Sequence, residues 1–177
     1  MINFVVQLLG IVGLILMALS YQMKERKGLL FMQMFSNAFL VAHYALLGAL
    51  VMVAMCAINI ARSIVFIAED KKGERNQKLL YVFLLISLVS GLLTWDGPLS
   101  LMVIVASLIL TVALYCRNLT LMRILFLFPP VLYISYNIMK GSIGGVGNDL
   151  FCFISAIVAL WRFNIKSKNN DKDIVAE

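Results

Sequence analysis

Positive charge in this chain is confined to every second link between its apolar stretches. These stretches fall at 2–21, 29–47, 50–68, 79–95, 99–116, 119–138 and 150–165. About 20 helical residues cross the 30 Å hydrocarbon core of a bilayer, so each stretch can form one span. All fifteen Lys and Arg residues except Lys140 then lie in or near the links after the first, third and fifth spans, or in the C-terminal tail. Adding or removing one span would distribute the Lys and Arg residues over both sides of the membrane, so the pattern supports seven spans.

The side that carries the Lys and Arg residues also predicts the orientation. Cytoplasmic links carry the Lys/Arg excess, which places the N-terminus outside and the C-terminus in the cytoplasm. We therefore predict an all-α polytopic membrane protein with the lipid bilayer as its partner. The mean hydropathy of +0.96 and the 62% hydrophobic content exceed what a soluble domain needs. The net charge of +6 is assigned to anionic headgroups and not to nucleic acid.

The sequence carries no signature of catalysis, of a cofactor or of a metal. Cys56, Cys116 and Cys152 lie in or at the ends of apolar stretches without disulfide or metal spacing, and we expect them to pack as small hydrophobic side chains. No metalloprotease, nucleophile-elbow, P-loop or dinucleotide motif is present. We expect no enzymatic activity, no cofactor and no metal.

The order of the spans divides the chain into two similar parts. Residues 1–68 form a first three-helix unit and residues 99–165 a second, with a linker helix and its loops at 69–98 and a polar tail at 166–177. A weak internal repeat matches 43–68 with 135–165. A single linker helix gives both units the same orientation. This 3+1+3 parallel-repeat arrangement occurs in one class of transporters, with the binding site between the halves.

Polar residues of the second and third spans gather on single helix faces. In the second span a stripe contains Gln33, Ser36, Asn37, His43 and Tyr44. Such a stripe faces other helices or a cavity; interhelical hydrogen bonds, worth about 0.6 kcal/mol each, are the alternative. In the third span Asn59 needs partners near mid-depth. Arg62 lies near the cytoplasmic end of its span, and we expect it, like Arg123 and Arg162, to extend to the headgroups.

The last two spans contain a helix breaker and further polar groups. Pro129-Pro130 predicts a kink near mid-membrane, read either as a hinge or as a static kink, with Tyr136 and Asn137 about two turns later. Asn148 and Asp149 are expected to cap the seventh span, with Ser155 deeper on the same face. No carboxylate is expected mid-span, so we assign His43, the single histidine, to hydrogen bonding rather than to proton coupling.

Several short segments of this chain are distinctive. They read HYALLG at 43–48, AINIAR at 57–62, LTLMR at 119–123 and KGSIGG at 140–145. With Gln33 and Trp161-Arg162, they make nearly the whole chain resemble the YgjV family of bacterial inner-membrane proteins. The resemblance implies a bacterial inner-membrane location and does not supply an activity.

A second, more distant resemblance concerns residues 20–28, which read SYQMKERKG. The segment is similar to the loop of PQ-loop and SWEET-like transporters, with Gln22 in the glutamine position. Tyr21 stands where the motif has proline, and residues 115–117 of the second unit have neither proline nor glutamine. The resemblance implies the 3+1+3 fold and an asparagine near the substrate on the third helix, as at Asn59.

These observations predict a facilitative carrier for a small polar or neutral solute. Its cavity would lie between the two units and be lined by the second, third, sixth and seventh spans. The predicted solute-binding residues are Gln33, Asn37, His43, Asn59, Tyr136, Asn137 and Ser155, and the predicted hinge residues are Pro129 and Pro130. The alternative is a non-transporting inner-membrane receptor, assembly factor or scaffold. A homo-oligomer is compatible with both interpretations.

Overall fold

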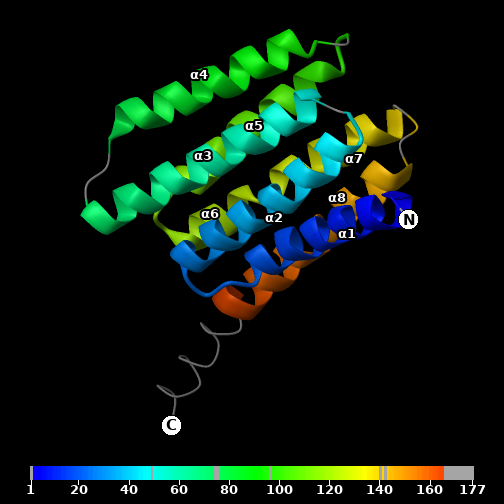
Figure 1. The fold of residues 1–177 in the computed structure, drawn as a ribbon. Coiled ribbons are helices and arrows are strands. Elements are labelled where there is room, and N and C mark those ends of the chain that lie inside the picture. Colours follow the sequence, from blue (N-terminus) through cyan, green and yellow to red (C-terminus); the bar gives the residue numbers. More distant parts are fainter. Residues whose placement is uncertain are drawn as a thin grey trace.

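A computed structural model describes residues 2–165, except residues 49, 74, 75, 96, 140 and 142. This part of the chain is helical and contains no strand (Figure 1). The helices are α1 (Ile2–Tyr21), α2 (Arg26–Leu46), α3 (Leu50–Lys72), α4 (Gln77–Leu93), α5 (Ser100–Tyr115), α6 (Leu119–Leu125), α7 (Phe128–Met139) and α8 (Ile143–Leu160), followed by a π-helical turn (Trp161–Ile165).

The lengths and compositions of the helices fit a multi-pass membrane protein. Five segments are long and apolar enough to cross a bilayer: Phe4–Tyr21, Arg26–Leu46, Met52–Lys72, Leu119–Met139 and Val146–Phe163. The apolar helices α4 and α5 are shorter, with 17 and 16 residues. Each predicted span corresponds to one helix, apart from the sixth, which is divided into α6 and α7. Large apolar side chains on α4, such as Leu85 and Leu93, are exposed as lipid contact requires.

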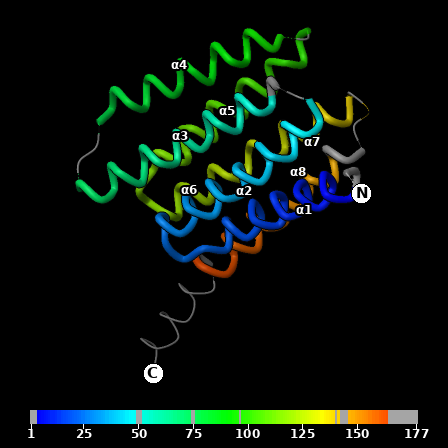
Figure 2. Tube along the Cα trace, in the orientation of Figure 1, coloured from blue at the N-terminus to red at the C-terminus, as the bar shows by residue number. Residues whose placement is uncertain are grey.

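The helices form two facing rows with one helix outside them. In one row α2 packs between α1 and α3, and in the other α7 packs between α5 and α8. The rows meet where α1 contacts α8 and where α3 contacts α5. Helix α4 packs on α5 at the edge of the bundle, as Figures 1 and 2 show.

Small residues set the packing of α4 on α5. The buried residues of α4 are Phe83, Ser87 and Gly91, one per helical turn. A Cβ added at Gly91 would overlap Cγ1 of Ile104 on α5. Small residues at this spacing let two helix backbones approach closely within a membrane, where packing and not water exclusion drives association.

One end of the bundle collects most of the positive charge. Helices α1, α3 and α5 all finish at this end, which we name the basic end (Figure 1). Lys24, Lys27, Lys71, Lys72 and Arg117 lie in or within two residues of the last turns of these helices or the first turn of α2. Helices α2, α4 and α7 finish at the opposite end. The expected alternation of charge along the chain therefore becomes a difference between the two ends of the bundle.

The hydrophobic core is concentrated toward the basic end. It contains Tyr21 from α1, Leu29 from α2 and Leu114 from α5, each with under a tenth of its surface exposed. The Phe66 ring of α3 packs edge-on against Phe83 and Tyr115, with ring centroids 5.5 and 5.8 Å apart. Aromatic contacts of this kind hold α3 against α4 and α5.

Three expectations about helix boundaries need correction. Helix α8 begins at Ile143 and not near residue 150, so residues 143–149 of the glycine-rich segment are helical. A start at 150 would leave 16 residues up to and including Ile165, near the lower limit for a span. Asn148 and Asp149 therefore lie inside α8, and the prediction that they cap it is wrong. Helix α3 continues to Lys72, which places Arg62 near its middle.

The sixth span, which we predicted to kink at Pro129-Pro130, is interrupted just before these prolines. Helix α6 ends at Leu125, and α7 begins at Phe128. Pro129 and Pro130 are buried in the first turn of α7, where a helix does not need their missing N–H groups. The preceding helix loses the donors that would bond the carbonyls four residues earlier. The prolines therefore start a new helix instead of bending a continuous one.

Candidate functional site

A chain of polar side chains crosses the bundle at mid-depth, from α2 through α3 to α5 and α4. Asn59 Nδ2 donates to Asn37 Oδ1 at 3.3 Å, and Arg62 Nη2 donates to Asn59 Oδ1 at 3.0 Å. Arg62 Nη1 donates to Thr111 Oγ1 at 2.7 Å. The Thr111 hydroxyl in turn lies 3.2 Å from Ser87 Oγ. These bonds connect the first three-helix segment of the chain to the rest of the bundle.

Arg62 is the charged member of this chain, and it lies deep in the bundle. Only 4% of its surface is exposed. It precedes Lys72, the last residue of α3, by ten residues, or about 15 Å of helix. The expectation that Arg62 extends to the headgroups is therefore wrong. The error came from ending the third span at residue 68, and the hydrogen bonds to Thr111 and Asn59 hold the side chain inward instead.

Arg62 has two features that are unusual for a buried arginine. Its Nε atom is buried and has no hydrogen-bond partner in the described part of the chain. No carboxylate of the described residues lies within ion-pair distance of it. Its two acceptors, the Thr111 hydroxyl and the Asn59 amide, carry no net charge. A buried charge without a counter-charge is costly, so this position requires a functional explanation.

A cavity adjoins Arg62 between α3, α4, α5 and α7. Its volume is about 70 Å³, and it is lined by Met55, Ile58, Asn59, Arg62, Ser87, Ser90, Ser107, Leu110 and Tyr133. The lining combines hydroxyl, amide and guanidinium groups with aliphatic side chains and a thioether. A site with this mixture can orient a small polar molecule.

The cavity does not lie between the expected spans. We predicted walls from the second, third, sixth and seventh spans, whereas the walls come from the third, fourth, fifth and sixth. Of the predicted binding residues only Asn59 lines the cavity. Asn37 lies one hydrogen bond behind it and also donates to the backbone oxygen of Gln33 at 2.7 Å. Both Gln33 and Asn37 are buried.

Two further residues of the polar stripe on α2, Ser36 and His43, face α1. Ser36 Oγ donates to the carbonyl oxygen of Gly13 at 2.7 Å. His43 Nδ1 lies 2.7 Å from the carbonyl oxygen of Val6, and its ring packs edge-on against Tyr44. These contacts fit interhelical hydrogen bonding, the alternative that the sequence left open. They place His43 at the α1–α2 interface, away from the cavity lining.

The solute-binding residues that we predicted in the second unit do not line the cavity either. Ser155 Oγ donates to the carbonyl oxygen of Ala18 at 2.6 Å and accepts from Gln22 Nε2 at 3.1 Å. Gln22, the residue in the PQ-like position, therefore joins the end of α1 to α8. Tyr136 is half-buried on α7.

Asn137 bonds with an acidic residue that we expected at the surface. Asn137 Nδ2 donates to Asp149 Oδ2 at 2.7 Å, and Asn148 Nδ2 lies 3.1 Å from Asp149 Oδ1. Asp149 is buried in α8 with 9% of its surface exposed. Asp149 therefore lies in the first two turns of α8 and not before the seventh span, because α8 begins two turns earlier than predicted.

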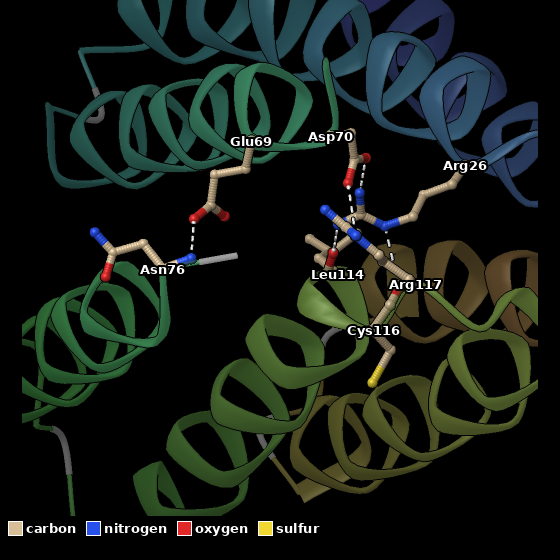
Figure 3. Close-up of polar contacts among 7 residues, drawn as sticks. All are labelled: Arg26, Glu69, Asp70, Asn76, Leu114, Cys116 and Arg117. Atoms are coloured by element: carbon tan, nitrogen blue, oxygen red, sulfur yellow. Dashed lines mark hydrogen bonds and ion pairs between the residues drawn. The ribbon is translucent and has the colours of Figure 1, made fainter. Parts of the chain in front are cut away.

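A second polar cluster lies at the basic end, as Figure 3 shows. Arg26, at the start of α2, forms an ion pair with Asp70 on α3. It also donates through Nε to the carbonyl oxygen of Cys116 at 3.0 Å, and through Nη2 to that of Leu114. Arg117 Nε lies 3.7 Å from Asp70 Oδ1. We name these five residues the basic-end cluster; they join α2, α3 and the end of α5.

Arg123 was also expected to extend to the headgroups, and it does not. It is 5% exposed, donates to the carbonyl oxygen of Met23 at 3.1 Å, and lies over the Phe163 ring at 4.5 Å from the centroid. Arg162 is exposed and also contacts this ring, at 5.1 Å. A long basic side chain near a helix end can thus bond inward when carbonyls and an aromatic ring lie within its reach.

Sequence reasoning missed most of the cavity, although a signal was present. Ser87 and Ser90 on α4, and Ser107 and Thr111 on α5, are polar residues three or four positions apart within otherwise apolar helices. This spacing places each pair on one helix face. In the described part of the chain, no group of His, Cys, Asp or Glu side chains is placed to hold a metal ion.

No curated protein and no solved structure matches this chain. A family profile, Imp-YgjV, described as a bacterial inner membrane protein, matches residues 4–167. The match covers all eight helices apart from the first residues of α1. It agrees with the apolar helices and with the charged end of the bundle, and the chain therefore belongs to the Imp-YgjV family of bacterial inner membrane proteins.

Proposed function

We propose that this protein is a facilitative carrier for a small polar solute, which binds in the cavity between α3, α4, α5 and α7. The observation that carries the proposal is this polar cavity of about 70 Å³ beside Arg62. Polar groups inside a membrane bundle are costly and mark pathways or binding sites. A scaffold has no use for a cavity lined by an arginine, an amide and several hydroxyls.

The pairing of the two rows supports the proposal. The first helix of one row, α1, contacts the last helix of the other, α8, and α3 likewise contacts α5. Two units related by a two-fold axis along the membrane normal would pair in this way. Parallel-repeat transporters use that arrangement and bind their substrates between the units.

A carrier also needs an end that closes and a helix that moves. In this proposal the basic-end cluster is the closed gate. Asp70 follows Arg62 by eight residues on α3, or about 12 Å. The moving element is the broken span of α6 and α7, because Tyr133 lines the cavity one turn after Pro129 and Pro130. Discontinuous helices near the midplane are a recurring feature of transporter sites.

The proposal is tested by the accessibility of the cavity from both sides of the membrane. Cys56, Cys116 and Cys152 are replaced by alanine, and Ser107→Cys supplies a single thiol in the cavity. A membrane-impermeant maleimide is applied to right-side-out and to inside-out vesicles. Ala106→Cys, one residue away and fully buried, is the matched control.

A carrier exposes Ser107→Cys to both faces in turn, while Ala106→Cys stays unlabelled. Asp70→Asn removes the acidic partner of Arg26 and should shift labelling toward the face at the basic end. Labelling of Ser107→Cys from one face only, unchanged by Asp70→Asn, contradicts the carrier. That result favours the non-transporting receptor, assembly factor or scaffold.

A further inference from the structure

We infer that the cavity binds a small anion, such as a short carboxylate, and that Arg62 supplies its counter-charge. The inference rests on the proposed function in placing the solute in this cavity, and it names the chemical class of that solute. Four observations carry it: the charge of Arg62, the comparison with the other buried arginines, the free donors and the size of the cavity.

The first observation is an uncompensated positive charge. A guanidinium remains protonated in proteins, so Arg62 is a cation although only 4% of its surface is exposed. No described carboxylate lies within ion-pair distance of it. Removing a charge from water without a partner is strongly unfavourable. An anion in the adjoining cavity would supply the missing charge.

The other two buried arginines of the described chain have partners that Arg62 lacks. Arg26 has the carboxylate of Asp70. Arg123 lies over the Phe163 ring and bonds with the carbonyl oxygen of Met23. Neither of them lines the cavity, and Arg62 alone of the three does so. Arg62 therefore lacks a counter-charge at the one position of the three that adjoins a cavity with room for an anion.

The third observation is the supply of hydrogen-bond donors. A guanidinium has five N–H groups, and the bonds to Thr111 and Asn59 use one hydrogen on each terminal nitrogen. The buried Nε has no acceptor, so the side chain keeps unused donors at Nε and at the terminal nitrogens. Nε and its neighbouring terminal nitrogen form the paired donors through which a guanidinium binds both oxygens of a carboxylate. Tyr133 also lines the cavity, and its hydroxyl can rotate toward an oxygen.

The size and the apolar part of the cavity limit the anion. A bound water occupies about 10–15 Å³ of this measure of volume, so about 70 Å³ holds roughly five to seven groups of that size. A carboxylate with two to four carbons fits this space. Its carbon atoms would face Met55, Ile58 and Leu110, and its oxygens would face Arg62.

The test compares two molecules of the same shape that differ in charge. The full-length protein is purified in detergent, and its thermal unfolding is followed with sodium propionate or with propionamide. Ionic strength is held constant with sodium gluconate, which is too large for the cavity. A ligand that binds the folded state raises the melting temperature by mass action. We expect propionate to raise it and propionamide to leave it unchanged.

Substitutions at Arg62 locate the bound anion. Arg62→Gln should weaken propionate binding roughly ten- to a hundredfold, because it removes a charged donor. Arg62→Lys keeps the charge and loses the paired donors, so its response should lie between those of Arg62→Gln and the wild type. A propionate response that Arg62→Gln leaves intact overturns the inference.

Asn59→Asp gives a second test, in which the protein supplies the counter-charge itself. Asn59 Oδ1 already accepts from Arg62 Nη2 at 3.0 Å, so this substitution places a carboxylate beside the guanidinium. The substitution also removes the Nδ2 donor to Asn37, so the readout is the response to ligand, and we expect none to propionate. A propionate response of wild-type size in Asn59→Asp overturns the inference.

The outcomes separate this inference from the proposed function. Equal rises in melting temperature with propionate and propionamide would mean that the cavity binds neutral polar solutes. That result overturns the inference of an anion site and does not contradict the proposed carrier. If neither propionate nor propionamide raises the melting temperature, the inference of an anion site is overturned. Labelling of Ser107→Cys from both faces would then still support a carrier. One-sided labelling together with a propionate response that depends on Arg62 supports the anion site and removes the carrier.

Discussion

Arg62 on α3 donates a hydrogen bond to Thr111 on α5, with 2.7 Å between Nη1 and Oγ1. The bond joins the first three helices of the chain to the part that follows α4. It also fixes the guanidinium at the wall of the cavity, because Asn59 holds the other terminal nitrogen. One bond to α5 and one bond within α3 therefore hold this cation in the middle of the bundle.

Thr111→Val should destabilise the protein by about 1–3 kcal/mol, because it keeps the side-chain shape and leaves a buried donor of Arg62 without its acceptor. The measurement is the midpoint of denaturant unfolding in detergent. Thr94→Val is the control, since Thr94 is exposed at the end of α4 and its loss leaves no buried donor unpaired. Equal midpoints for the two variants would show that the bond to Arg62 contributes little.

Gly91→Ala should separate α4 from α5. The new methyl group would overlap Ile104, and overpacking of this kind costs about 1–3 kcal/mol. Gly147→Ala is the matched control, because a Cβ at this helical position meets nothing within 4 Å and alanine favours a helix by about 1 kcal/mol. Melting temperatures should therefore move in opposite directions. A stabilised Gly91→Ala would mean that the two helices do not pack through this glycine.

Removing Arg26 should have a larger effect than removing Arg117. Arg26 is 9% exposed and pairs with Asp70, whereas Arg117 is 44% exposed and lies farther from the same carboxylate. Loss of one partner of a buried pair costs about 3–5 kcal/mol, and loss of an exposed one about 0–1 kcal/mol. Thermal unfolding of Arg26→Gln and Arg117→Gln compares them. Similar losses for both would contradict the role assigned to Arg26 in the basic-end cluster.

The double replacement Pro129→Ala/Pro130→Ala should join α6 and α7 into one helix. It restores two N–H donors and removes the ring clashes, so we expect higher stability together with a single access state. Single cysteines along 128–139, labelled from each face of the membrane, report the access state. One-sided labelling that is identical with and without the prolines would make the break between α6 and α7 a static feature.

The C-terminus should lie in the cytoplasm, because the basic end carries the Lys/Arg excess. A reporter that is active only in the cytoplasm is fused after Glu177, and in a second protein after Gly48, at the opposite end of the bundle. We expect activity from the first fusion alone. Activity only after Gly48 would reverse the orientation.

Features that depend on the chain locally could be predicted from the sequence. The number of apolar segments follows from the thickness of the bilayer. The break of the sixth span follows from the rings of Pro129 and Pro130, which restrict the backbone in any environment. The grouping of Lys and Arg at one end follows from the alternation of links. The family resemblance, which is also a property of the sequence, was confirmed over residues 4–167.

The site itself was decided by the tertiary structure. The depth of Arg62 depends on where α3 ends, and the partner of Asp149 depends on where α8 begins; in both cases the helix continued past the predicted boundary. Which polar face meets which neighbour depends on how each helix is rotated in the bundle. That rotation turned His43 toward α1 and brought Asn59, Arg62 and Thr111 together. A single sequence does not determine it, because it results from side-chain packing between helices far apart in the chain.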